Sequence, residues 1–262
     1  MEWQAPAIVL ETRLYGEHDI IAAVFTEEHG LHRGLARGGA GRAGAALWQA
    51  GNLVTARWVG RLADQLGHLS AELVHPAAAL VLEDALALAM LRALTATAAG
   101  ALAERQAHAR LFAPMLSFIA ALTGEEESRP ALLADYVRLE AALLGELGYG
   151  LALDACALTG ARTGLAFVSP RSGRAVTADA AGQWAGRLLR LPGFLAGGNA
   201  MPGPADWRDG LALTGHFLAR DAFGHHHRPL PAARIALFDR VAALAGDATQ
   251  APRPATEPSE SP

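Results

Sequence analysis

Short apolar stretches separated by polar residues and turns fill the first 75 residues, a pattern typical of β-strands. Five stretches are predicted as strands, residues 7–13, 19–26, 31–37, 52–59 and 66–74, and the third alternates apolar with basic residues, as a strand with one wet face does. The second is rich in β-branched and aromatic residues and leads into a turn through Glu28, His29 and Gly30. Short strands in such close succession predict a small closed β-barrel.

The pattern changes at Pro76. From residue 77 to 147 the chain is rich in Ala and Leu, and apolar residues recur at helical spacing, which predicts packed helices. The last of them is expected to begin near Ser128, with Pro130 in its first turn, and to end near Gly148. Residues 151–182 lose the periodicity and predict an irregular insert. Further helices are predicted near 180–190, 204–221 and 231–245.

These patterns together predict an α+β protein with two domains. Residues 1–76 form a five-stranded barrel, and the oligonucleotide-binding (OB) fold has this number of strands. Residues 77–245 form an all-α domain that contains the insert at 151–182. Residues 246–262 are rich in Pro, Ser and Glu, and we expect them to be a disordered tail.

Composition narrows the class of protein. With 52% hydrophobic and 18% charged residues, the chain is expected to be globular, and a net charge of −4 confines any nucleic-acid binding to a local patch. The single cysteine, Cys156, excludes an intramolecular disulfide and favours a reducing cytoplasm. The N-terminus lacks the features of a signal peptide, and Glu83, Asp84 and Arg92 interrupt the most apolar stretch. No membrane-spanning helix is therefore expected.

The sequence contains one local patch of positive charge that could bind nucleic acid. All 22 basic residues are arginine, and the window 29–61 contains arginines but no acidic residue. Guanidinium groups on a Gly-rich segment, residues 37–44, predict a mobile loop that binds phosphates. Trp48 and Trp58 could stack on bases, although Trp58 lies within an apolar strand and is expected in the core. The predicted nucleic-acid-binding residues are Arg13, Arg33, Arg37, Arg42, Arg57 and Arg61.

Catalytic motifs are scarce. The sequence has no Walker-type loop, no GxSxG and no HExxH motif. The histidines at 225–227, with His216 and Asp221, are the one cluster that hints at a metal-dependent hydrolase. Consecutive imidazoles point in different directions, so a loop before Pro229 is the preferred interpretation. We expect no enzyme activity and no cofactor.

Several segments resemble the recombination mediator family RecO. They occur in the family's order from about residue 5 to residue 245, and they are Tyr15-Gly16-Glu17-His18-Asp19, Ala36-Arg37-Gly38, Leu147-Gly148-Tyr149, Phe167-Val168-Ser169-Pro170-Arg171-Ser172-Gly173 and Leu230-Pro231-Ala232-Ala233-Arg234. The resemblance implies an N-terminal OB barrel and a helical C-terminal domain. It also implies binding of single- and double-stranded DNA, annealing of complementary strands, and help in replacing single-strand-binding protein with RecA. The implied direct partners are RecR and the acidic C-terminal tail of single-strand-binding protein, and the implied location is cytoplasmic and nucleoid-associated.

The chain departs from the family at one point. Many members hold zinc with two CxxC pairs in the insert, but the corresponding positions here are Cys156, Thr159, Val176 and Asp179. These side chains cannot form a tetrahedral thiolate site, so we expect a degenerate zinc-finger-like insert without metal. An RNA-binding barrel protein in RNA processing or translation remains the alternative to the DNA mediator, because the same arginines would serve either ligand.

Overall fold

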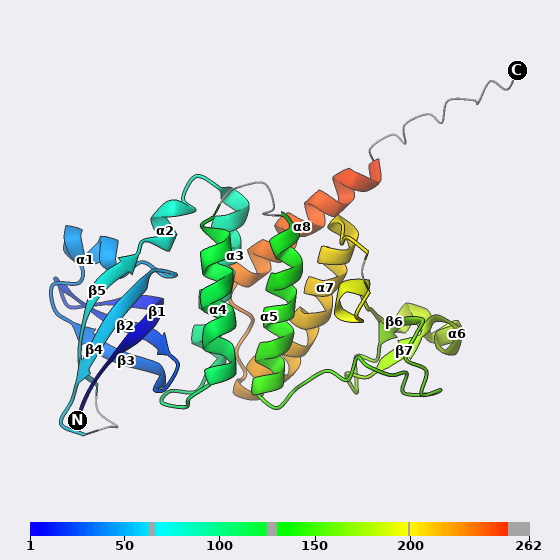
Figure 1. The fold of residues 1–262 in the computed structure, drawn as a ribbon, viewed down its shortest axis with the longest axis horizontal. Helices are drawn as coiled ribbons and strands as arrows, with labels where there is room; N and C mark the ends of the chain where they lie inside the picture. The colour runs from blue at the N-terminus through cyan, green and yellow to red at the C-terminus, as the bar shows by residue number, and fades with distance from the viewer. Residues whose placement is uncertain (63–65, 125–129, 199, 251–262) are drawn as a thin grey trace, which may run out of the picture.

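The structure, a computed structural model, describes residues 1–62, 66–124, 130–198 and 200–250. The molecule is elongated, with a β-barrel at one end, a bundle of helices in the middle and a small insert at the other end (Figure 1). In these residues no helix combines the length and the apolar character needed to cross a membrane.

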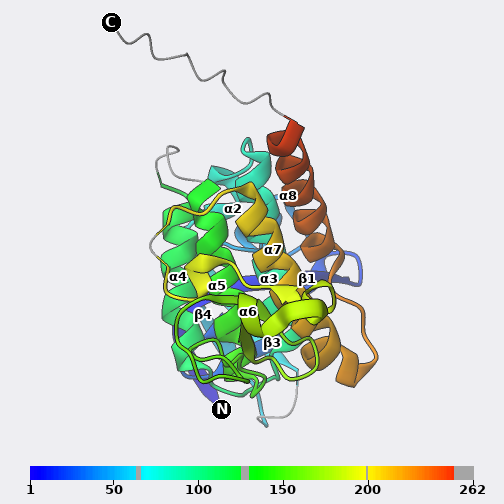
Figure 2. The ribbon, with the colours of Figure 1, turned by 90° about the vertical axis from the view of Figure 1, so that its right-hand side faces the viewer.

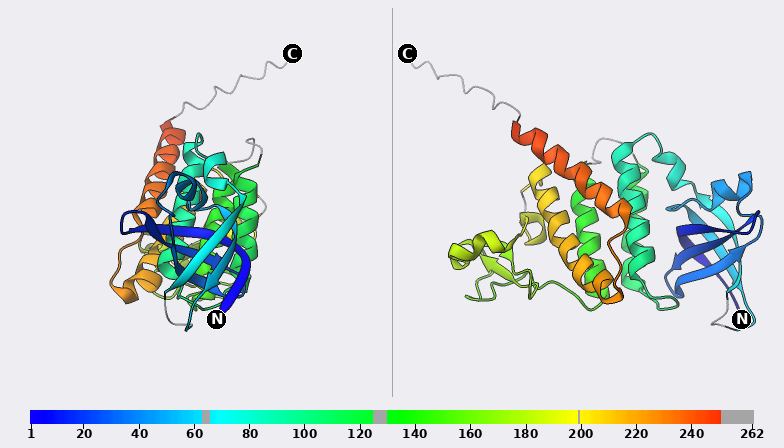
Figure 3. Two further views of the ribbon diagram at one scale, coloured as in Figure 1. Left: turned by 90° about the vertical axis from the view of Figure 1, so that its left-hand side faces the viewer. Right: turned by 180° about the vertical axis from the view of Figure 1, so that it is seen from behind.

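The N-terminal barrel is closed by strands in the order β1-β2-β3-β5-β4 (Figure 3, left). Their bounds are β1 (Glu2–Tyr15), β2 (Asp19–Thr26), β3 (Gly30–Ala36), β4 (Leu53–Val59) and β5 (Gly67–His75). Adjacent strands are antiparallel except β3 and β5, which pair in parallel over two residues. The predicted five-stranded barrel is confirmed, with β1 longer at both ends than its apolar pattern indicates.

The segment between β3 and β4 is more ordered than predicted. It was expected to be a mobile Gly/Arg loop, but it forms a turn followed by the short helix α1 (Arg42–Leu47). The backbone N–H of Gly38 donates to Asp19 at 2.8 Å, and that of Ala40 donates to the carbonyl of His18 at 3.0 Å. Gly39 packs so closely on Ile20 that a Cβ there would lie 2.5 Å from Cγ1 of Ile20. Close backbone packing on β2 therefore fixes the turn.

The helical domain follows directly after β5. Its helices are α2 (Ala77–Leu80), α3 (Ala85–Ala101), α4 (Ala109–Leu122), α5 (Leu132–Glu146), α7 (Pro204–Phe217) and α8 (Ala232–Gln250). Asp84 caps α3 by accepting from the N–H groups of Leu86 and Ala87, each at 2.8 Å. Ser128, the predicted start of α5, lies outside the described residues. α8 includes residues 246–250, which the sequence assigned to the tail, and the rest of that tail is not described.

One outer face of the barrel packs against these helices. The apolar run at 7–10 in β1 is buried on both sides: Ala7 and Val9 face the barrel interior, and Ile8 and Leu10 join the core of the helical domain. Phe25 of β2 contacts Phe112 of α4 edge to face, with ring centroids 5.8 Å apart. The outer face of the barrel therefore belongs to the core of the helical domain, while the barrel interior is a separate core.

The centre of the helical domain holds a buried ion pair. Arg234 of α8 pairs with Glu140 of α5, and both side chains are 2% exposed. The Arg234 guanidinium also donates to the carbonyl of Leu211 in α7 at 2.7 Å, and the Thr214 hydroxyl donates to Glu140. This network joins α5, α7 and α8.

The insert contains β-structure that the sequence did not predict. It has a three-stranded sheet in the order β7-β6-β8, of which β6 and β7 are labelled in Figure 1, so the prediction of an all-α C-terminal domain is wrong in this region. Figure 2 views the insert end-on, with α6 towards the viewer. Its elements are β6 (Leu165–Val168), β7 (Ala175–Thr177), α6 (Ala178–Ala181), a 3-10 helix (Gly182–Arg187) and β8 (Leu189–Arg190). Because β8 pairs with β6, this unit extends beyond the predicted limit at residue 182. Strands of two to four residues are too short to reveal a period of two.

Candidate nucleic-acid interface

Two of the six predicted arginines already have carboxylate partners. On β3, Arg33 donates to Glu11 of β1 at 3.0 Å and to Glu104 of the segment before α4. Burial lowers the pKa of Arg33, but the hydrogen bonds to Glu104 and Glu11 outweigh it and raise the pKa. On β4, Arg57 pairs with Glu2 at 2.6 Å.

Arg33 belongs to the junction between the barrel and the helical domain. Leu31, two residues earlier on β3, forms a bridge with Glu104, and its carbonyl accepts from the N–H of Arg105 at 2.8 Å. Gly30 lies so close that a Cβ there would be 1.9 Å from the carbonyl oxygen of Gln106. The guanidinium of Arg33 therefore neutralises two carboxylates where the segment before α4 meets β3.

The other four predicted arginines lie on the exposed surface of the barrel. They have no ion pair within the described residues, and they are Arg13 on β1, Arg37 after β3, Arg42 at the start of α1 and Arg61 after β4. These four cations remain available to a ligand.

Strand pairing places Arg13 in one row across the sheet with residues that are distant in the sequence. Arg13 of β1 is opposite Ile21 of β2, Ile21 is opposite Leu35 of β3, and Leu35 is opposite His68 of β5. The same side of the sheet carries Glu11 and Arg33, which meet on the outside of the barrel, so this row faces outward. We name Arg13, Ile21, Leu35 and His68 the open row.

The open row is the part of the barrel face that the helices leave uncovered. Farther along the same face, Phe25 and Leu31 are fully buried against the helical core. In OB folds the face of strands 2 and 3 binds oligonucleotides. In this protein only the end of that face distant from the helices is accessible.

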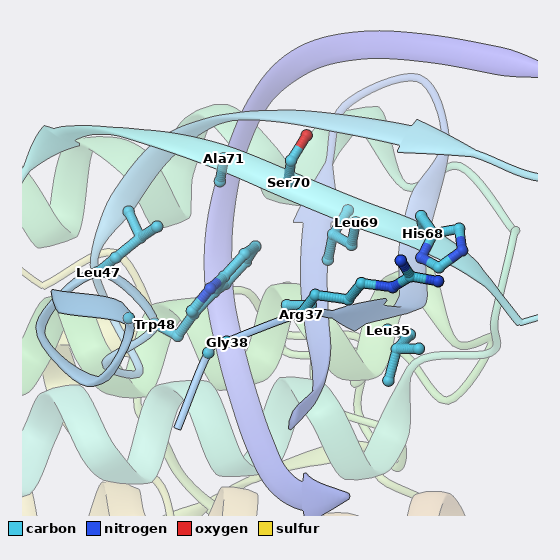
Figure 4. Close-up of a pocket in the computed structure, with 12 residues that line it drawn as sticks. Leu35, Arg37, Gly38, Leu47, Trp48, His68, Leu69, Ser70 and Ala71 are labelled. Carbon is cyan, nitrogen blue, oxygen red and sulfur yellow. The ribbon is translucent and has the colours of Figure 1, made fainter. Parts of the chain in front are cut away.

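A hollow of about 520 Å³ adjoins the open row. It lies where β3 and β5 diverge and α1 fills the gap, with Leu35, Leu47, Trp48 and Leu69 among its walls. The side chain of Arg37 extends across it towards His68 (Figure 4). The hollow therefore combines an apolar wall with a guanidinium and an imidazole at its rim.

The tryptophans near this site are structural. Trp58 is 2% exposed inside the barrel, which confirms the expectation that it is a core residue. Trp48 is 5% exposed, so it offers a wall of the hollow and no open ring face for stacking. The sequence analysis considered these indoles as stacking residues but did not predict that Ile21, Leu35 and His68 belong to the candidate interface. Their outward positions follow from strand alternation, but their proximity to Arg13 and Arg37 depends on the strand pairing.

The histidine cluster does not converge in the described residues. His216 contacts the carbonyl of Pro170 at 3.1 Å, Asp221 is held by Arg220, and His225 stacks on Tyr149 with centroids 5.8 Å apart. Among the described residues no group of three His, Cys, Asp or Glu side chains is placed to hold a metal ion.

The four positions expected to be a degenerate zinc site, Cys156, Thr159, Val176 and Asp179, lie in the insert, and the first three are held by packing or hydrogen bonds. Cys156 and Val176 belong to a small core with Phe167 and Ala181. The Cys156 sulfur accepts from the N–H of Thr177 at 3.4 Å. A hydrogen bond with Thr159, and the Thr177 N–H, lower the pKa of Cys156 to about 6. Asp179 is exposed in α6. A thiol, a hydroxyl, an alkyl group and a carboxylate do not supply the ligands of a tetrahedral thiolate zinc site.

Comparison with known proteins covers nearly the whole chain. The family model described as Recombination protein O N terminal matches residues 1–77, and the one described as Recombination protein O C terminal matches residues 82–229. The chain is 57% identical over 244 residues to the DNA repair protein RecO of Acidiphilium cryptum, covering 92% of this chain and 96% of that protein. It is 55% identical over 245 residues to the DNA repair protein RecO of Granulibacter bethesdensis, covering 93% and 97%. The N-terminal match ends two residues after β5, and the C-terminal match runs from α3 to α7 and includes the insert, so the chain belongs to the recombination protein O (RecO) family.

Proposed function

We propose that this protein is a DNA repair protein that acts without catalysis as a recombination mediator. It binds single- and double-stranded DNA, anneals complementary strands, and helps RecA replace single-strand-binding protein. The observation that carries the binding part of the proposal is the open row beside the Arg37 hollow. Membership of the RecO family, with relatives named as DNA repair proteins, supports the choice of DNA over RNA.

The proposed contacts divide the six predicted arginines into two groups. Arg13 and Arg37 contact phosphates at the open row, and Arg42 and Arg61 extend the positive surface to either side. Arg33 and Arg57 are already neutralised by Glu11, Glu104 and Glu2, so we assign them a positioning role. The apolar wall of the hollow admits a base whose phosphate lies against Arg37.

Annealing by this surface requires no bond chemistry. Two DNA strands repel each other because both are polyanions, and a bound row of guanidinium groups lowers that repulsion and releases counterions. Holding two strands on one protein also raises their effective concentration. We therefore propose that annealing needs neither nucleotide hydrolysis nor a cofactor.

The proposed protein partners are RecR and the acidic tail of single-strand-binding protein, with RecA affected indirectly. For the tail, a suitable hollow of about 470 Å³ lies between α4 and α5. Phe118, Leu132 and Leu139 line it and would take the apolar end of the peptide. Arg138 at its edge forms an ion pair with Asp135 at 2.7 Å, so the peptide carboxylate would have to displace Asp135 from this guanidinium. A labelled acidic peptide should bind the wild type and should bind Arg138→Ala more weakly. Equal binding to both would move the tail to another surface.

Annealing of two complementary labelled oligonucleotides, without ATP, tests the proposed function. The wild type should accelerate annealing at low salt, and Arg13→Ala/Arg37→Ala should be slower. Arg240→Ala, which removes an exposed arginine of α8, is the matched control and should behave as wild type. Absence of DNA binding and of annealing at low salt would refute the mediator function.

Competition between single-stranded DNA and RNA of the same sequence separates the two nucleic-acid hypotheses. DNA should compete at least as well as RNA for a labelled DNA oligonucleotide across a salt series. A consistent preference for RNA at every salt concentration would favour the RNA-binding alternative.

A further inference from the structure

The insert carries an exposed tryptophan, Trp184. Its side chain is 54% exposed, whereas Trp48, Trp58 and Trp207 are at most 8% exposed. Trp3 is partly buried between His29 and Trp58 in the barrel. An indole is the largest apolar side chain, and leaving it in water forgoes substantial burial energy. Trp184 therefore contributes little to the core for its size.

The position of Trp184 is nonetheless fixed. It lies in the 3-10 helix Gly182–Arg187, which follows α6 directly. Ala181 before it is buried in the small core of the insert, and Ala185 and Leu188 pack against that core. The guanidinium carbon of Arg187 lies 5.2 Å from the centre of the indole ring. An aromatic surface and a cation are thus held side by side.

The insert is also basic. Residues 151–198 contain five arginines against Asp154 and Asp179, a local charge of +3 in a chain of net charge −4. None of these arginines forms an ion pair with any described residue. Arg190 stacks on the Phe167 ring at 5.0 Å, so a second guanidinium is ordered by an aromatic side chain of the same unit.

The insert lies at the far end of the molecule from the barrel (Figures 1 and 3). The helical bundle separates the two, and the insert projects from the bundle with α6 at its outer end (Figure 1). A ligand on the insert would therefore not compete for space with a ligand on the open row.

We propose that the insert is a second binding surface for single-stranded nucleic acid, with one base stacked on Trp184 and the adjoining phosphate held by Arg187. This inference rests on the proposed function and adds a separate site to it. A base supplies the planar partner that an exposed indole accepts, and a phosphate supplies the anion that Arg187 lacks. A single strand fits better than a duplex, because only an unpaired base exposes its full face. With one strand at each end, the molecule holds the two reactants of annealing at once.

Intrinsic fluorescence tests the proposal directly, because Trp184 is the most exposed of the tryptophans. The full-length protein is titrated with unlabelled oligothymidylate of ten nucleotides, and Trp184→Phe provides the background from the other four indoles. Stacking should quench the wild type and should leave Trp184→Phe nearly unchanged. Arg13→Ala/Arg37→Ala should keep the quenching, since its insert is intact.

Affinity is then measured in the Arg13→Ala/Arg37→Ala background, where the barrel site is weakened. Adding Trp184→Ala should lower the remaining affinity for the oligonucleotide by about 5- to 150-fold, the range typical of one lost base stack. Arg187→Ala should also weaken binding, more than Arg162→Ala, a control in the same insert. Circular dichroism should show that each variant is folded, because these side chains are exposed.

The outcomes separate this site from the barrel site. If a labelled oligonucleotide binds by anisotropy but Trp184 fluorescence does not change, the insert site is wrong and the proposed function stands. If no oligonucleotide binds at all, the proposed function itself fails. If an acidic peptide quenches Trp184 and oligothymidylate does not, the surface belongs to a protein partner and the proposal is overturned.

Discussion

Replacing Arg234 by Met tests the idea that one buried ion pair holds the helical domain together. Methionine keeps the length of the side chain but removes the charge, so Glu140 on α5 loses the guanidinium that contacts both of its carboxylate oxygens. Both groups are 2% exposed, so water cannot replace the lost partner. The Leu211 carbonyl of α7 also loses a 2.7 Å hydrogen bond.

The expected loss of stability is large. Removing one partner of a buried pair costs about 3–5 kcal/mol, because the other charge remains buried without compensation. With a urea m value of about 3 kcal/mol per M, the upper end of the usual range, the unfolding midpoint should fall by about 1 to 2 M. That is a substantial part of the roughly 5–15 kcal/mol that stabilises an ordinary domain.

Urea denaturation followed by circular dichroism measures this change. The double variant Glu140→Leu/Arg234→Met removes both charges and should recover most of the stability, since Thr214 still donates to the Gly210 carbonyl at 3.1 Å. A midpoint for Arg234→Met within experimental error of wild type would refute the reasoning. So would a double variant less stable than Arg234→Met alone.

Three further predictions concern the barrel and the insert. Burial lowers the pKa of His32 from its ordinary value of 6.5, so His32 binds a proton less readily in the folded barrel than in the unfolded chain. The contribution of His32 to the free energy of unfolding should be constant above pH 6.5 and fall as the pH drops below it. A His32→Phe variant whose stability falls equally steeply would contradict this. Gly30→Ala places a Cβ 1.9 Å from the Gln106 carbonyl and should destabilise the protein much more than Gly16→Ala. Gly16 has a similar positive φ but open space around it, so equal urea midpoints would exclude the steric explanation. Metal analysis of the purified protein should find less than stoichiometric zinc, because Cys156 is the one thiol of the chain, and one zinc per chain would overturn that expectation.

The barrel could be predicted because its strands carry their own signal. Residues 19–26 are rich in apolar and β-branched side chains that alternate between the interior and the outer face of the barrel, and the predicted and observed bounds of β2 agree. β1 extends beyond its apolar run because its ends pair with β4 and β2, and pairing does not require apolar residues. The helices likewise followed from Ala- and Leu-rich spacing and from local caps such as Asp84.

The site could be predicted only in part, because its geometry depends on contacts between distant residues. The acid-free window at residues 29–61 contained Arg37, whose role stays a prediction, but it could not show that Glu104, 71 residues away, neutralises Arg33. Nor could it show that pairing through β2 and β3 brings Arg13 into the row of His68. The insert escaped prediction for a different reason, since its strands are too short for periodicity and its core is built around Cys156 and Phe167.

The salt dependence of single-stranded DNA binding tests the central claim most directly. Each phosphate contact contributes about 0.7 to the slope of log K against log salt for a single strand. Arg13→Ala/Arg37→Ala should therefore lower the magnitude of the slope by about 1.4, while Arg240→Ala leaves it unchanged. A double variant with the wild-type slope and affinity would place the DNA outside the open row and the adjoining Arg37 hollow, and would contradict the account.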